Sequence, residues 1–329
     1  MLRQAPLARK KSMSQPTDIT LSALRLTRRY GTGLAVAELD LELHRGEVLG
    51  LLGPNGAGKS TTIQMLTGNL APSSGSITVC GIDLLEHPKR AKAKIGYLPE
   101  TPPLYRELNV DEFLTFCARL HRLPSTEIAP AVQNAKARCG LSDMGKRLIA
   151  HLSKGYQQRV GIAQAILHEP DVVILDEPTV GLDPNQIRDI RALIRELSTQ
   201  HSVILSTHIL PEVEAVCDRV KIMHRGKIVF SDSIEGLRRS QQTEMLLLRF
   251  ARPPTLDAFT QATGISAVKI IENGLFQVAC SADSPLTETI TQAAASQSWG
   301  LTQLIPQRAS LEDVFSELTL SAHATEENP

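Results

Sequence analysis

The chain has 329 residues, of which 42% are hydrophobic and 21% are charged. These fractions are typical of folded globular proteins and exclude a wholly disordered chain. The 35 Lys and Arg residues balance the 35 Asp and Glu residues, so the basic excess expected of a nucleic-acid-binding protein is missing. Apolar runs such as Val172 to Leu175 fall far short of the ~18 residues that cross a bilayer, and we therefore expect no membrane span.

The cysteines and the N-terminus give no sign of secretion. Five cysteines form no Cys-x-x-Cys pair and no cluster with histidine, which favours free thiols over disulfides or a zinc site. The basic residues between Arg3 and Lys11 precede no apolar run, so we expect no signal peptide. We interpret residues 1–19 as a flexible tail, with Met13 as a second candidate start.

The first two thirds of the chain alternate strand and helix patterns. Short β-rich runs, one apolar strand buried on both faces and amphipathic helical periods predict an α/β domain over residues 20–238. A helical subdomain is expected at about 108–168. The expected strands are 39–43, 47–52, 76–79, 172–175 and 202–206, and the expected helices are 59–70, 111–120 and 184–200.

A second pattern begins after the polar stretch 238–243. The order β-α-β-β-α-β resembles a ferredoxin-like module and predicts a small α+β accessory domain over residues 239–320. A last helix is expected at 310–318, followed by a flexible tail at 321–329. The expected strands are 245–250, 267–271, 275–280 and 300–305, and the expected helices are 256–263 and 286–296.

One glycine-rich segment predicts a phosphate-binding loop. It fits the pattern G-x-x-x-x-G-K-[ST] and lies between a predicted strand and a predicted helix, as this motif requires. Backbone N–H groups and the helix N-terminus would face phosphates, while the lysine would reach the β and γ oxygens and the serine would ligate Mg²⁺. The loop therefore predicts a bound polyphosphate together with Mg²⁺. The segment comprises Gly53, Pro54, Asn55, Gly56, Ala57, Gly58, Lys59, Ser60 and Thr61.

Two acidic residues end the buried strand at 172–175. Asp176 is placed to enter the Mg²⁺ shell, and Glu177 to orient or deprotonate an attacking water. Acidic residues commonly end strands, so this pair alone does not indicate a catalytic site. Together with the phosphate-binding loop upstream, it does.

Five further segments resemble the motifs of ABC ATPases, in the order and spacing of that family. Residues 152–160 resemble the signature motif, and residues 181–184 the D-loop. Residues 206–208 resemble the switch segment, whose histidine is His208. Tyr30 matches the aromatic residue that stacks on adenine, and residues 97–100 occupy the place of the Q-loop.

The resemblance implies a fold, an activity and partners. The fold would be a P-loop NTPase cassette of the ABC type, with a mixed sheet core and a helical subdomain. The chain would bind and hydrolyse ATP as a head-to-tail homodimer, or with a paralogous cassette. Ser153 and Gly155 would then complete the nucleotide site of the facing subunit, Asp183 would also bind nucleotide, and Glu177 and His208 would be catalytic.

The same resemblance implies transport through a membrane permease made of other chains. Residues 98–105 and 310–319 are similar to ATPase subunits of exporters, which favours export. We expect a cytoplasmic chain, peripheral on the inner face of the plasma membrane, docked near residues 100–108. No nucleic-acid partner is expected.

Three positions in two motifs depart from the family pattern. Lys154 and Tyr156 replace the usual Gly and Gln of the signature motif, so the implied contacts fall on Ser153 and Gly155. Glu100 replaces the usual Gln of the Q-loop, and its carboxylate would face Mg²⁺ or water.

A soluble ABC ATPase acting on ribosomes or DNA is the alternative reading. Such proteins usually carry two cassettes or long inserted coiled coils, and the sequence shows neither. The neutral net charge also disfavours this alternative.

Overall fold

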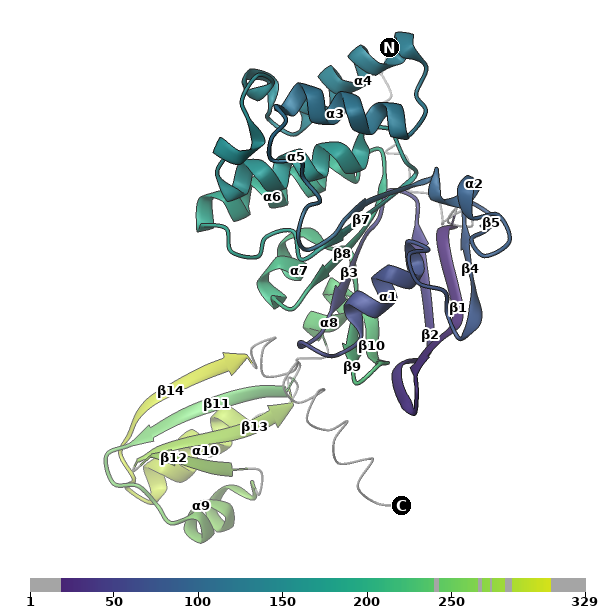
Figure 1. Cartoon of the computed structure of the whole chain (residues 1–329). Coiled ribbons are helices and arrows are strands. Elements are labelled where there is room, and N and C mark those ends of the chain that lie inside the picture. The colour runs from purple at the N-terminus through teal and green to yellow at the C-terminus, as the bar shows by residue number, and fades with distance from the viewer. Residues whose placement is uncertain (1–18, 240–242, 266–267, 273, 282–285, 309–329) are drawn as a thin grey trace, which may run out of the picture. The chain divides into compact units, whose positions relative to one another are not determined.

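A computed structural model of the chain describes residues 19–239, 243–265, 268–272, 274–281 and 286–308 (Figure 1). Two compact units divide the described residues: one lies within 1–218 together with 225–227, and the other within 219–224 and 228–329. The domain boundaries at residues 19, 238 and 320 remain predictions, and the helix expected at 310–318 lies outside the described residues. Within these ranges, no helix combines the length and the apolar character needed to cross a bilayer.

Four parallel strands carry the segments that matter for function. Strands β3 (Val48–Leu52), β8 (Ser202–Thr207), β7 (Val172–Asp176) and β6 (Ile95–Leu98) lie side by side, and parallel registers join each neighbouring pair. Every residue of β3, β7 and β8 is buried, as their continuous apolar sequences predict. The hydrogen-bonded order of these four strands is β3-β8-β7-β6, and strands β9 (Arg219–His224) and β10 (Lys227–Ser233) follow along the chain.

A separate antiparallel sheet is built from the N-terminal strands. Strand β1 (Ile19–Tyr30) pairs with β2 (Gly33–His44) on one side and β4 (Ser74–Val79) on the other, and β5 (Ile82–Asp83) completes the order β2-β1-β4-β5. Leucines alternate along β2, so that Leu39, Leu41 and Leu43 are buried while the residues between them face outward.

The predicted helical subdomain contains three packed helices (Figure 1). Helix α3 (Val110–Leu120) begins with a capping box in which Asn109 and Glu112 bond each other's backbone N–H groups. Helices α4 (Ser125–Arg138) and α5 (Lys154–Ile166) follow, and short 3-10 turns lie at 142–144 and 149–151.

The remaining helices of this part connect or flank the strands. Helix α1 ends at Leu66, four residues before the predicted end at Leu70, because Thr67 caps it and Gly68 turns into the left-handed region at φ +69°. The others are α2 (Pro88–Lys92), α6 (Pro184–Leu197), α7 (Leu210–Val216) and α8 (Ile234–Arg239), and α1 itself spans Lys59–Leu66.

The C-terminal part confirms the predicted β-α-β-β-α-β order. Its antiparallel sheet has the order β12-β13-β11-β14, so the first strand, β11, lies between the third and the fourth. Phe250, Phe259, Phe276 and Trp299 pack in its core with stacked and edge-to-face rings. The elements are β11 (Thr243–Phe250), α9 (Leu256–Thr263), β12 (Val268–Glu272), β13 (Leu275–Ser281), α10 (Leu286–Ser296) and β14 (Leu301–Arg308).

Candidate functional site

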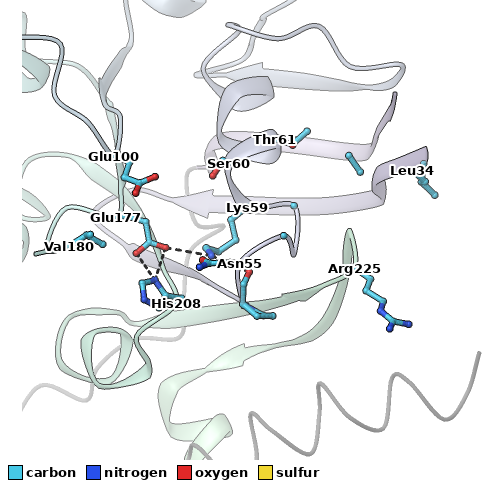
Figure 2. Close-up of a pocket in the computed structure, with 14 residues that line it drawn as sticks. Leu34, Asn55, Lys59, Ser60, Thr61, Glu100, Glu177, Val180, His208 and Arg225 are labelled. Atoms are coloured by element: carbon cyan, nitrogen blue, oxygen red, sulfur yellow. Dashed lines mark hydrogen bonds and ion pairs between the residues drawn. The ribbon is translucent and has the colours of Figure 1, made fainter. Parts of the chain in front are cut away.

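Three segments meet where parallel strands end. The glycine-rich loop follows β3, the acidic pair comes at the end of β7, and His208 follows β8. The carboxyl ends of neighbouring parallel strands share one edge of a sheet, which is where α/β proteins place their ligands. A cavity of about 600 Å³ opens there. Its lining includes Pro54, Asn55, Gly56, Gly58, Lys59, Ser60, Thr61, Glu100, Glu177 and His208 (Figure 2).

The loop itself is shaped to present backbone donors. Gly58 caps helix α1 at φ +103°, a conformation that residues with a Cβ atom avoid. The helix then begins at Lys59 with its first N–H groups at the cavity, an arrangement that attracts anions such as phosphate. Two predicted loop residues do not line the cavity: the carbonyl of Gly53 accepts a hydrogen bond from Lys59, and the carbonyl of Ala57 accepts one from Gly226 N–H.

Lys59 and His208 both approach the carboxylate of Glu177 (Figure 2). The ammonium of Lys59 lies 3.5 Å from Glu177 Oε1 and donates to the carbonyl of Gly53 at 2.7 Å. The Nδ1 atom of His208 lies 3.1 and 3.0 Å from the two oxygens of Glu177. Lys59 and Glu177 are buried, at 6% and 8% exposure, so these interactions are weakly screened by solvent.

The backbone at Glu177 is strained. Its φ angle is +47°, in the left-handed region that non-glycine residues seldom occupy. The N–H of Glu177 donates to the carbonyl of Ser206 at 3.0 Å, which continues the pairing of β7 with β8 by one residue.

Asp176 has the properties of a cation ligand. It is 5% exposed, and its Oδ1 atom has no hydrogen-bond partner among the described residues. Burial raises the pKa of the Asp176 carboxyl above its ordinary value, because its charged form loses hydration. Across the described ranges, no group of three or more His, Cys, Asp or Glu side chains could hold a metal alone. The Asp176 carboxylate suits Mg²⁺, which binds through few carboxylates together with hydroxyl, water and phosphate oxygens.

Four lining residues were not predicted from the sequence. Leu34 and Ala35 come from the start of β2, Val180 follows Glu177, and Arg225 lies in the turn between β9 and β10. This turn is hydrogen-bonded to the phosphate-binding loop, because the N–H of Gly226 donates to the carbonyl of Ala57. The carbonyl of Gly226 also accepts from the N–H of Ala37 in β2. The pair Arg225-Gly226 is a turn signal, but the sequence carries no sign that this turn returns to the loop.

Tyr30 lies at the end of β1 and outside the cavity lining. The residue is 51% exposed, and the guanidinium of Arg28 lies 4.7 Å from the ring centre. The stacking role of Tyr30 remains a prediction.

The signature-like segment lies at the start of α5. Ser153 is exposed and caps this helix by accepting from Tyr156 N–H at 3.5 Å. The Gln186 side chain packs so closely on Gly155 that an added Cβ would lie 2.6 Å from Gln186 Cδ. A side chain at position 155 would therefore require the end of the Gln186 side chain to move. Asp183 caps α6 by accepting from the N–H groups of Asn185 and Gln186.

Comparison with known proteins identifies the family. The sequence profile described as ABC transporter matches residues 36–180. The ABC transporter ATP-binding protein NatA of Bacillus subtilis (strain 168) is 39% identical over 64% of this chain and 87% of its own length. The uncharacterized ABC transporter ATP-binding protein YdbJ of the same bacterium is 33% identical over 92% of this chain and 95% of its own length. A solved ATP-binding subunit of an ABC transporter superposes with a TM-score of 0.61 at 34% identity, covering 67% of this chain and 92% of that chain.

The chain belongs to the ATP-binding subunits of ABC transporters. The predicted fold class is confirmed. The protein is an ATPase that powers transport through a separate membrane permease, as the sequence predicted.

Proposed function

We propose that ATP binds in the cavity over the phosphate-binding loop, with its phosphates against the start of α1. The observation that carries this proposal is the convergence of Lys59, Glu177 and His208 at that cavity. Lys59 contacts phosphate oxygens, and Ser60 and Asp176 hold Mg²⁺, with Glu100 beside them. When bound, Mg²⁺ neutralises charge on the phosphates.

The roles of the residues follow from their chemistry. The carboxylate of Glu177 orients the attacking water and accepts its proton. His208 holds that carboxylate through Nδ1, at 3.0 Å in this structure, and its other ring nitrogen is available to a phosphate oxygen. Tyr30 supports the adenine ring from the end of β1.

A second subunit completes the site. The exposed start of α5 presents the Ser153 hydroxyl and the backbone N–H groups of a helix N-terminus, which favour an anion. We expect each ATP to lie between the phosphate-binding loop of one subunit and Ser153, Gly155 and Asp183 of its partner, in a homodimer or with a paralogous cassette.

The permease docks near residues 100–108 and the adjoining helices. Tyr105 packs edge-on against Phe116 at 5.4 Å between ring centres, yet both residues are partly exposed, at 48% and 38%. Leu120, one turn beyond Phe116 on α3, is 65% exposed. Exposed apolar side chains gathered in this way suit a protein partner. The subunit would then lie on the cytoplasmic face of the plasma membrane and drive export.

The shared site is tested by mixing two inactive variants. Lys59→Ala removes a phosphate contact from one subunit, and Ser153→Arg blocks the start of α5 in the other. Each variant alone has no intact site, whereas mixed dimers have one, so we expect ATPase activity to reappear on mixing. Ser125→Arg, at the exposed start of α4, is the matched control and should stay active. A covalently linked pair that stays inactive would contradict a shared site.

The permease is tested separately. An affinity-tagged full chain is recovered from detergent-solubilised membranes, and we expect an integral membrane protein to accompany it. Phe116→Glu should reduce this recovery without changing ATP binding, whereas Glu127→Lys on exposed α4 should not. Recovery of ribosomal proteins without any membrane protein would contradict transport.

A further inference from the structure

A buried carboxylate contacts the two segments that carry the candidate catalytic residues. Glu212 belongs to helix α7 and is 1% exposed. Its Oε1 atom accepts a hydrogen bond from the hydroxyl of Thr179, and its Oε2 atom accepts one from the hydroxyl of Thr207 at 2.8 Å. Both threonines are buried, at 3% and 0% exposure. One side chain therefore joins two segments that are far apart in the sequence.

The two threonines flank the residues of the site. Thr179 comes two positions after Glu177, and Thr207 ends β8 immediately before His208. The Thr207 hydroxyl oxygen also accepts from Ile209 N–H at 3.1 Å, which fixes the backbone on the far side of His208. The Glu212 carboxylate thus links the loop that carries Glu177 to the strand end that carries His208.

The strained backbone of Glu177 needs support on both sides. Before it, the hydrogen bond to the carbonyl of Ser206 fixes the end of β7. After it, the bond from Thr179 to Glu212 holds the returning loop. A residue at φ +47° keeps that conformation only where its surroundings impose it, and these two anchors do so.

Stability alone is a poor explanation for Glu212. Burying a carboxylate costs hydration, and the two hydroxyl groups that bond it offset that loss only in part. Apolar side chains of similar volume at Glu212 and at both threonines would fill the same space without that cost. What Glu212 does contribute is a fixed position for the Thr179 and Thr207 hydroxyl groups.

We propose that Glu212 is a positioning residue for ATP hydrolysis: it holds Thr179 and Thr207 so that the carboxylate of Glu177 and the ring of His208 stay within hydrogen-bonding distance. The proposal rests on the catalytic roles proposed for Glu177 and His208. A small displacement of a catalytic base lowers the rate of the chemical step more than it changes substrate affinity.

The test compares threonine variants of the full chain by basal ATP hydrolysis. Thr179→Val removes the hydroxyl at constant shape, and we expect kcat to fall roughly tenfold or more while KM for ATP changes less than about twofold. Thr179→Ser keeps the hydroxyl and should restore most of kcat. Thr20→Val is the matched control, because Thr20 is also buried and donates one hydrogen bond, to the carbonyl of Leu43 in the antiparallel sheet. It should lower the melting temperature similarly and leave kcat unchanged.

Two outcomes would overturn the proposal: a Thr179→Val kcat equal to that of Thr20→Val, or a higher KM with unchanged kcat. If Thr179→Val does not fold, Glu212→Gln decides the matter, since it keeps the shape and one acceptor. Its kcat should fall several-fold at unchanged KM, and a wild-type kcat would overturn the proposal. Glu177→Gln is measured alongside. If that variant hydrolyses ATP at the wild-type rate, the proposed function of the site fails, whatever the threonine variants do.

Discussion

Glu177 has two partners that hold its carboxylate from different directions. The ammonium of Lys59 and the Nδ1 atom of His208 approach it at 3.5 and 3.0 Å. Lys59 and Glu177 are buried, whereas His208 is partly exposed, and all three side chains line the cavity. In the proposed function, ATP binding depends on Lys59 and hydrolysis depends on Glu177, so we expect mutations to separate the two steps.

Glu177→Gln should therefore bind ATP without hydrolysing it. The amide has the shape of the carboxylate but cannot accept the proton of water, so we expect hydrolysis to fall by about 100-fold or more. The ATP-bound dimer should then persist, and light scattering in the presence of ATP and Mg²⁺ should show twice the mass of the monomer. Glu86→Gln, at an exposed position, is the control and should behave as wild type. Hydrolysis at the wild-type rate in Glu177→Gln would contradict the assignment.

At the scale of elements, the end of α3 meets the end of α5 through two histidines. The rings of His121 and His168 stack at 3.8 Å between centres and 12° between planes. His168 Nε2 also lies 3.1 Å from the carbonyl of Ile95, at the start of β6. Burial, and next the neighbouring His121, lower the pKa of His168 from 6.5 to about 4.

This junction should make stability depend on pH. In the unfolded chain, His168 binds a proton below pH 6.5, whereas in the folded chain it stays neutral down to about pH 4. The free energy of unfolding therefore decreases as pH falls through this range. We expect a loss of about 2 kcal/mol from His168 between about pH 7 and pH 5.

Urea denaturation followed by circular dichroism measures this loss, because the single tryptophan, Trp299, reports only on the C-terminal part. His168→Gln should flatten the pH dependence, and His87→Gln, at an exposed histidine, should leave it unchanged. An unchanged slope in His168→Gln would contradict the prediction.

The elements also show what a sequence can predict. Continuous apolar runs and turn residues gave β3, β7 and β8 nearly to the residue, since strands buried on both faces need such runs. The end of α1 was placed too late, because the capping at Thr67 and Gly68 overrode the helical pattern that follows. Local patterns therefore predict most elements and place their ends less well.

The candidate site likewise contains residues that the sequence predicts and residues that it does not. Segments that end strands of one sheet must lie together, so the structure brings Lys59, Glu177 and His208 to one cavity as their order predicts. Leu34 and Arg225 reach the cavity from other strands and turns. Only tertiary packing determines such contacts, and no motif encodes them.

At the scale of the whole molecule, the C-terminal part has a core of its own. Phe250, Phe259, Phe276 and Trp299 pack with the aliphatic residues of β11, β13 and α10. A domain of about 80 residues can be stable with such a core. We therefore expect nucleotide binding to be independent of residues after Arg239.

A chain that ends at Arg239 tests this independence. It should remain soluble and bind an ATP analogue with Mg²⁺ at an affinity within about threefold of the full chain. Its dimer affinity or its permease-stimulated hydrolysis should change. The same shortened chain with Lys59→Ala is the control and should lose nucleotide binding. Aggregation of the shortened chain, or loss of binding while it remains folded, would contradict the prediction.

The turn at Arg225-Gly226 has a consequence for the order in which the protein can be made. Gly226 donates to the carbonyl of Ala57 and accepts from Ala37 N–H, so the phosphate-binding loop is braced by a segment synthesised long after it. The neighbour of β3 in the parallel sheet, β8, also arrives late, at 202–207. Contacts so distant along the chain form slowly and only after the intervening chain has left the ribosome. A nascent chain therefore carries its phosphate-binding motif for about half of translation before the segment that hydrogen-bonds the loop has been made.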